Sequence, residues 1–245
     1  MKAAFSPKRP GFSVAPGNER KIMLVDDHPV MREGLAQMIN HEADLTVCGQ
    51  FEDGARAFAA IAALSPDLAI VDLSLKGSNG LELVKNIKAS YPKLRMLVLS
   101  MYDESLYAER VLRAGGAGYI MKEEATEQVM GAIRQVLNGD IYLSSRMSSR
   151  LMHQLVGGRP APGASVMERL SDRELEVFGL IGQGRSTRQI AEQLHLSVKT
   201  VESHRAHIKE KLNIRSAAEL AYRAFQLRGE QTDLPGGRSP APSRL

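Results

Sequence analysis

The apolar positions between residues 21 and 139 follow two alternating patterns. Short, mostly apolar runs without a polar side are typical of strands buried on both faces of a sheet. The segments between them repeat apolar residues at i, i+3 and i+7, which predicts helices with one buried side. This alternation predicts an α/β domain with a five-stranded parallel, doubly wound (flavodoxin-like) sheet. We expect strands at 21–26, 45–51, 68–73, 95–100 and 118–122, and helices near 29–40, 54–64, 80–90, 104–114 and 125–138.

A second, shorter module with only helical patterns occupies residues 166–230. Ser171 and Glu174 form a capping-box signature at its start. Two apolar-faced segments, 186–194 and 198–212, are separated by a three-residue turn, which predicts a small all-α domain containing a helix-turn-helix. The predicted organisation is a disordered extension over 1–20, a first domain over 21–140, a Gly/Pro-rich linker over 141–165, the helical domain over 166–230 and a disordered tail over 231–245.

The composition of the chain argues against a membrane protein and against a secreted, disulfide-bonded protein. The chain has 245 residues, 43% hydrophobic and 24% charged, as in ordinary globular proteins. No apolar stretch approaches the roughly 20 residues of a membrane helix, and residues 1–17 lack the apolar centre of a secretory signal. A single cysteine, Cys48, excludes an internal disulfide and fits a reducing compartment. We therefore expect a cytoplasmic protein with no membrane partner.

The two domains differ in charge. Residues 21–140 carry 12 Lys and Arg against 17 Asp and Glu, a net charge of −5, whereas residues 168–228 have a net charge of +3. This asymmetry favours a cation site in the first domain and an anionic partner for the second.

Polar side chains end four of the predicted strands. Asp26 and Asp27 close the first, Asp72 the third, Ser100 the fourth and Lys122 the fifth. In an open parallel sheet the carboxyl ends of the strands share one rim, so these residues should line one pocket. The carboxylates of Asp26, Asp27 and Asp72, with the Ser74 backbone carbonyl, suit Mg²⁺. A carboxylate there can accept a phosphoryl group, whose oxygens Lys122 and Ser100 would bind.

The second helix of the helix-turn-helix has an inner and an outer side. Val198, Val201, Ile208 and Leu212 should face the core. The outer side is polar and basic, as in a recognition helix that enters the DNA major groove. An ordinary charged helix surface would have the same pattern of residues. His204 fits either a partly buried core position or a phosphate contact. The candidate DNA-binding residues are Thr187, Ser197, Lys199, Thr200, Glu202, Ser203, His204, Arg205 and Lys209.

Residues 21–139 resemble the receiver domain of response regulators. The matching features are the Asp26-Asp27 pair, Asp72 in Val-Asp-Leu-Ser-Leu, Gly80, Ser100, and Tyr119 three residues before Lys122. The resemblance implies that Asp72 accepts a phosphoryl group from the phosphohistidine of a sensor histidine kinase, and that Tyr119 changes rotamer on activation. Lys76 and Glu123 stand where many relatives have proline, which leaves open whether the peptide after Lys122 is cis.

Residues 167–229 resemble the LuxR/FixJ-type DNA-binding domain. The matching pattern is Leu-Ser-x-Arg-Glu-x-Glu-Val, then Ile-Ala-x-x-Leu, Ser-x-x-Thr-Val-x-x-His and Ile-x-x-Lys-Leu. Together the modules look like a NarL/FixJ-family transcriptional response regulator. This implies a transcription regulator rather than an enzyme. It also implies double-stranded promoter DNA as a partner, a homodimer when phosphorylated, and RNA polymerase as a candidate contact.

The sequence argues against three other classes of protein. A phosphatase of the haloacid dehalogenase type would need a second aspartate two residues after Asp72, where Ser74 stands. A LuxR-type receptor for a diffusible ligand would need an apolar pocket in place of the charged rim. A receiver fold controlled without phosphorylation would not need the whole set of Asp26, Asp27, Asp72, Ser100 and Lys122.

Overall fold

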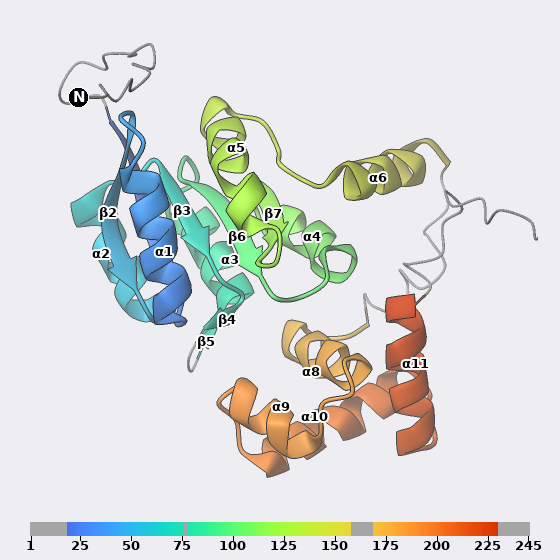
Figure 1. The fold of residues 1–245 in the computed structure, drawn as a ribbon. Coiled ribbons are helices and arrows are strands. Elements are labelled where there is room, and N and C mark those ends of the chain that lie inside the picture. Colours follow the sequence, from blue (N-terminus) through green and yellow to red (C-terminus); the bar gives the residue numbers. More distant parts are fainter. Residues whose placement is uncertain (1–18, 76–77, 158–168, 230–245) are drawn as a thin grey trace, which may run out of the picture. The chain divides into compact units, whose positions relative to one another are not determined.

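The computed structural model describes residues 19–75, 78–157 and 169–229 (Figure 1). The predicted disordered tail and all of the predicted disordered extension except residues 19 and 20 lie outside these residues. Lys76 and most of the Gly/Pro-rich part of the predicted linker lie outside them too. The contacts of the chain divide it into two compact units, residues 1–99 with 114–142, and residues 100–113 with 143–245. None of the described helices is long and apolar enough to cross a membrane.

The first unit is built on the predicted five-stranded parallel sheet, in the order β2-β1-β3-β6-β7. The central strands β1 and β3 pair with Val25 opposite Val71, and β3 pairs with β6 with Val71 opposite Val98. The strands are β1 (Arg20–Val25), β2 (Leu45–Phe51), β3 (Leu68–Val71), β6 (Arg95–Ser100) and β7 (Gly118–Met121); a separate two-stranded hairpin consists of β4 (Ser74–Leu75) and β5 (Ser78–Asn79).

Helices cover the sheet because its strands are apolar on both sides. One face packs against α1 and α5, and its core includes Leu24, Ile70, Leu97, Ile39 and Ile133. Helices α2 and α3 lie on the other face of the sheet (Figure 1), toward which the alternate residues of a strand point. The helices up to residue 138 are α1 (Pro29–Asn40), α2 (Gly54–Leu64), α3 (Gly80–Ser90), α4 (Glu104–Arg113) and α5 (Ala125–Asn138).

The second unit contains the predicted helix-turn-helix, formed by α9 and α10. Phe178 of α8, Ile190 of α9 and Ile208 of α10 are fully or almost fully buried and form the centre of this small core. Gly182 lets α8 and α11 approach closely, since a Cβ there would lie 2.5 Å from the Ala224 carbonyl oxygen. Besides α4, the described helices of this unit are α6 (Ser145–Gly157), α8 (Asp172–Gly182), α9 (Thr187–Gln193), α10 (Val198–Lys211) and α11 (Ala217–Gly229).

The element limits agree with the sequence pattern to within two residues over the sheet and its helices. Three features were not predicted: the β4–β5 hairpin, helix α11 as a separate element, and helix α6 inside the predicted linker. The assignment of Val198 to the core was wrong. It is the first residue of α10 and is 44% exposed, because the core contacts of this helix begin at Val201.

Candidate functional site

Three carboxylates meet at the carboxyl-end rim of the sheet, as the sequence predicts. Asp26 and Asp27 follow β1 and Asp72 follows β3, which are adjacent central strands. Asp72 is 1% exposed, Asp26 is also buried, and Asp27 is partly exposed. Each of these residues, together with His28, offers one ligand atom, and the four atoms lie within 4.8 Å of one another. The rim therefore concentrates negative charge in a small volume.

The backbone around Asp72 is held in place by hydrogen bonds to neighbouring segments. Its N–H donates to the Val25 carbonyl at 2.8 Å, and the Gly80 N–H donates to the Leu73 carbonyl at 2.9 Å. A side chain at position 80 could not fit, because a Cβ there would lie 2.0 Å from the Asp72 carbonyl oxygen. Gly80 thus allows the start of α3 to pass close to the Asp72 backbone.

Lys122 brings its ammonium group into the cluster. Its Nζ lies 2.8 Å from Asp26 Oδ2 and 2.7 Å from Asp72 Oδ2, and its side chain is only 3% exposed. Burial lowers the pKa of Lys122, but the charges of Asp72 and Asp26 raise it more, so the net pKa lies above the ordinary value. Lys122 is therefore charged at neutral pH and binds two of the three carboxylates. The peptide after it is trans, since the described residues include no cis peptide.

The other residues predicted for this site lie at or beside the same rim. Ser100 is buried at the end of β6, where its hydroxyl accepts a hydrogen bond from the Tyr102 N–H at 3.2 Å. Tyr119 is buried in β7. The Ser74 N–H donates to Asp72 Oδ1 at 3.1 Å, so the hairpin that follows Asp72 starts against its carboxylate.

His28 belongs to the same cluster and was not predicted. Its Nδ1 lies 2.8 Å from Asp27 Oδ1, 3.2 Å from Asp26 Oδ1 and 3.6 Å from Asp72 Oδ2. The nearby Asp72 carboxylate raises its pKa, burial and Lys122 lower it, and the net pKa lies above the ordinary value. The signal was available, since His28 directly follows Asp27 in the sequence.

The cluster has the composition of a divalent cation site. Burial raises the pKa of Asp27; the charges of Asp72 and Asp26 add to this rise and those of His28 and Lys122 oppose it, leaving the pKa above the ordinary value. Asp26 and Asp72 thus share one lysine, and Asp27 adds a third carboxylate beside them. Carboxylate oxygens are the ligands that Mg²⁺ prefers, and two added positive charges would relieve their repulsion. Asp26, Asp27 and Asp72 therefore fit such an ion.

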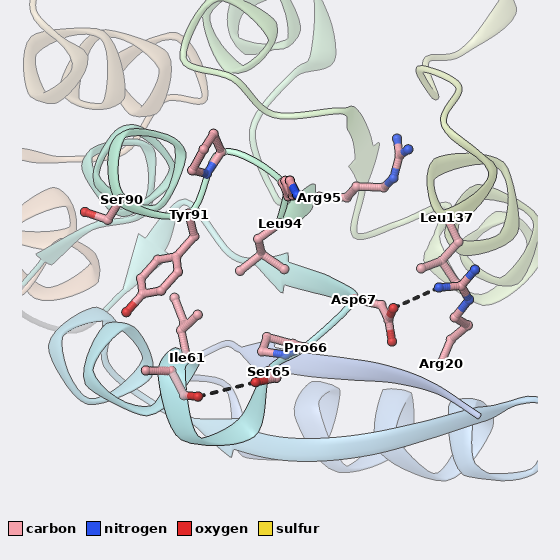
Figure 2. Close-up of a pocket in the computed structure, with 13 residues that line it drawn as sticks. Arg20, Ile61, Ser65, Pro66, Asp67, Ser90, Tyr91, Leu94, Arg95 and Leu137 are labelled. Carbon is pink, nitrogen blue, oxygen red and sulfur yellow. Dashed lines mark hydrogen bonds and ion pairs between the residues drawn. The ribbon is translucent and has the colours of Figure 1, made fainter. Parts of the chain in front are cut away.

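A pocket lies at the opposite rim of the same sheet, away from this cluster (Figure 2). Its volume is about 790 Å³, and its lining includes the Arg20–Asp67 ion pair, with 2.9 Å between Nη1 and Oδ1. Arg20 begins β1 and Arg95 begins β6, so the hollow is at the amino ends of the strands. In open α/β sheets ligands bind at the carboxyl ends of the strands, which makes the acidic cluster the better candidate for the functional site.

The start of α8 positions both helices of the helix-turn-helix. Arg173 donates to the Leu194 carbonyl at 2.7 Å, which fixes the end of α9. Glu174 closes the predicted capping box with Ser171, and its Oε2 also accepts from Lys211 Nζ at 2.6 Å at the end of α10. Burial raises the pKa of Glu174, but the hydrogen bonds from Lys211 and Ser171 lower it more, so the net pKa lies below the ordinary value.

The residues predicted to bind DNA lie on α9, α10 and the turn between them. Ser197 caps α10 by accepting from the Thr200 N–H at 3.0 Å, and the two hydroxyls lie 2.8 Å apart, so both side chains have a structural role as well. Burial, followed by the charge of Arg173, lowers the pKa of His204. Of the predicted set, Ser197, Lys199, Glu202 and Ser203 are exposed, while Thr187, Thr200, His204, Arg205 and Lys209 are partly exposed.

Comparison with known proteins identifies the family of each of the two domains. Residues 22–134 match the family model described as response regulator receiver domain, and residues 168–224 match the one described as bacterial regulatory proteins, luxR family. The oxygen regulatory protein NreC of Staphylococcus carnosus (strain TM300) is 40% identical over 210 residues, which cover 84% of this chain and 97% of that protein. NreC of Staphylococcus haemolyticus (strain JCSC1435) is 37% identical with the same coverage.

Solved structures with the same fold include complexes with DNA. RcsB from Salmonella enterica serovar Typhimurium, bound to promoter P1flhDC in the presence of phosphomimetic BeF₃⁻, is 27% identical and has a TM-score of 0.58, with 85% of this chain and 100% of that chain covered. The same protein bound to promoter rprA is 26% identical with a TM-score of 0.56, covering 85% of this chain and 99% of that one.

Proposed function

The chain belongs to the NarL/FixJ family of response regulators, in which a receiver domain precedes a LuxR-type DNA-binding domain, and we propose that Asp72 is the residue through which it is switched. It is a two-component transcription regulator and not an enzyme. The observation that carries the proposal is the position of Asp72. Its carboxylate is almost fully buried, bound by Lys122 and adjacent to two further carboxylates, at the rim where parallel sheets bind ligands.

The phosphoryl donor would be the phosphohistidine of a sensor histidine kinase. A carboxylate oxygen of Asp72 attacks phosphorus, the P–N bond breaks, and its electron pair returns to the imidazole nitrogen of the donor. Asp26, Asp27 and Asp72, with the Ser74 backbone carbonyl, would hold Mg²⁺. When bound, Mg²⁺ neutralises charge on the phosphoryl oxygens and orients the transfer.

Lys122 and Ser100 would stabilise the acyl phosphate. Lys122 now binds Asp72 Oδ2; after transfer its ammonium binds a phosphoryl oxygen instead, as a point charge. The Ser100 hydroxyl, now accepting from the Tyr102 N–H, donates to another phosphoryl oxygen. Tyr119 lies buried in β7 and would change rotamer as Ser100 moves toward Asp72.

The output would be sequence-specific binding to promoter DNA by α10. Its exposed polar side, with α9 and the turn, supplies the candidate contacts given above, and Arg205 and Lys209 would bind phosphates. Phosphorylated chains would form a homodimer on two half-sites about one helical turn, roughly 34–36 Å, apart. RNA polymerase is a candidate partner of the bound dimer. The cytoplasm is the expected location, because the promoter and a kinase phosphoryl donor both meet the protein there.

The test is phosphorylation by acetyl phosphate with Mg²⁺, followed by intact mass. The wild-type protein should gain about 80 Da, the mass of one phosphoryl group on the nucleophile. Asp72→Asn should not, because the amide is not a nucleophile. Asp140→Asn, at an exposed carboxylate of the same unit, is the matched control and should gain the same mass as wild type. A phosphorylated Asp72→Asn protein would refute the assignment.

A further inference from the structure

His28 is placed as the helix N-cap of α1 but its side chain does not cap the helix. Residues at this position usually accept a hydrogen bond from the first turn. Here Pro29 occupies the first turn and removes one of the N–H groups that need a partner. The imidazole instead points its Nδ1 at the carboxylates of Asp26 and Asp27. Its orientation is therefore explained by the acidic cluster and not by the helix.

The backbone holds His28 in this position. The His28 N–H donates to Asp26 Oδ1 at 2.8 Å, and the Arg32 guanidinium donates to the Asp26 carbonyl from the first turn of α1. These hydrogen bonds hold the turn from Asp26 to His28 in a fixed conformation, in which the donor atoms of all three side chains lie close together. The side chain of His28 is 59% exposed, which leaves it free to adjust by a rotation about its own bonds.

The separation of the donor atoms suits one small ion. Metal ions bound by oxygen and nitrogen at about 2.0–2.2 Å keep opposite donors about 4.0–4.4 Å apart. The four donor atoms here, three carboxylate oxygens and one imidazole nitrogen, lie within 4.8 Å of one another. This separation is close to that of donors around a single ion, and an ion there would share the site with Lys122 Nζ, which lies 3.4 Å from His28 Nδ1.

We propose that His28 is a nitrogen ligand of the metal in the acidic site, and that it makes the site select divalent transition metals such as Co²⁺ over Mg²⁺. The proposal rests on the proposed function, because it concerns the same site. Imidazole suits first-row transition metals, whereas carboxylates alone suit Mg²⁺, Ca²⁺ and Mn²⁺. A site of three carboxylates and one imidazole should therefore bind Co²⁺ more tightly than Mg²⁺, by more than the carboxylates alone would give.

The alternative role of His28 is purely electrostatic. A cationic imidazole among carboxylates would weaken the binding of every divalent ion by a similar factor. Selectivity, measured as the ratio of the Mg²⁺ and Co²⁺ dissociation constants, separates the two roles. Loss of a ligand lowers this ratio, but loss of a charge leaves it unchanged.

The experiment titrates the full chain with CoCl₂ and with MgCl₂ at one pH, following heat and the visible absorption of Co²⁺. His28→Ala should weaken Co²⁺ binding by at least about 10–100-fold, the loss of affinity typical when a partner of a metal ligand is mutated, should affect Mg²⁺ binding less, and should change the Co²⁺ spectrum. His41→Ala is the matched control, since His41 is exposed at the other end of α1. Its ratio and spectrum should equal those of wild type. Circular dichroism without metal checks that each variant folds.

The outcomes distinguish this inference from the function on which it rests. An equal change in both dissociation constants, or no change in either, would overturn the role of His28 as a ligand. If the wild type still gains a phosphoryl group with Mg²⁺ in that case, the proposed function stands. A wild type that binds neither ion at the acidic cluster would overturn both.

Discussion

Lys122→Met should destabilise the first unit and make its stability depend on Mg²⁺. Methionine keeps the length and apolar stem of lysine but removes the ammonium group. That group is bound to Asp26 at 2.8 Å and to Asp72 at 2.7 Å, with side chains that are 5% and 1% exposed. The variant therefore leaves two carboxylates buried without the cation that compensates them.

The expected loss is large because neither carboxylate can be hydrated. Removing one partner of a buried ion pair typically costs about 3–5 kcal/mol, a substantial part of the roughly 5–15 kcal/mol that stabilises a domain. Since the pair is buried, added salt should screen this loss only slightly. The attraction of Asp72 and Asp26 also keeps the pKa of Lys122 above its ordinary value, against the effect of burial, so the lysine is charged at neutral pH.

Mg²⁺ should restore part of the loss, because it would bind the same carboxylates. An ion at 100 times its dissociation constant stabilises the folded state by about 2.7 kcal/mol. The variant should bind Mg²⁺ more tightly than wild type, as the competing ammonium is gone. Saturating Mg²⁺ should thus raise the free energy of unfolding of the variant by more than that of wild type.

Urea unfolding followed by tyrosine fluorescence measures this effect. Five of the six tyrosines lie between residues 91 and 142, so the signal reports mainly on this part of the chain. Lys93→Met, at an exposed lysine, is the control and should unfold as wild type does at both Mg²⁺ concentrations. A loss below about 1 kcal/mol, the value of an exposed pair, or an equal loss with and without Mg²⁺, would refute the reasoning.

Three further predictions concern the DNA-binding unit. Arg205→Ala and Lys209→Ala should each reduce the slope of log K against log salt by about 0.9, one phosphate contact, in a promoter-binding titration; unchanged slopes in both would contradict this interface. Ile208→Asp should abolish the helical signal of this unit in circular dichroism, because Ile208 is fully buried; native helicity would contradict that burial. The pKa of Glu174 is below its ordinary 4.5, since hydrogen bonds such as that from Lys211 outweigh the effect of burial. Its stabilising contribution should be complete above about pH 4.5 and disappear as the pH falls through the folded pKa; Lys211→Met should show a smaller loss in calorimetry over that range, and an equal loss would count against the pair.

The sheet and its rim were predictable because burial of a strand on both faces produces a simple pattern in the sequence. A strand covered on both sides is a continuous apolar run, and its first polar residue marks its end. Asp72 and Lys122 are 50 residues apart, yet both had to reach the same rim, because Asp72 follows the central strand β3, Lys122 follows the edge strand β7, and the strands of the sheet are parallel. This part of the site follows from topology and not from any local signal.

The features that were missed depend on contacts between residues far apart or on side-chain direction. Glu174 was predicted only as half of a capping box, whereas its partner Lys211 lies 37 residues later. The direction of the His28 side chain follows from the closed turn at Asp26, which no periodicity reveals. Val198 fits the apolar stripe of α10 by spacing but precedes the first core contact of the helix.

Charge balance, more than burial or distance, separates Asp72, the proposed phosphorylation site, from the structural carboxylate of Glu174. Asp72–Lys122 and Glu174–Lys211 have nearly equal lengths, 2.7 and 2.6 Å, and each carboxylate is buried. Glu174 has its own lysine and a backbone donor, so its charge is compensated within the fold. Asp72 shares Lys122 with Asp26, and the adjacent Asp27 adds a third negative charge. The site therefore keeps a net negative charge that a divalent cation can neutralise. Mg²⁺ should therefore offset the loss caused by Lys122→Met and leave that of Lys211→Met unchanged.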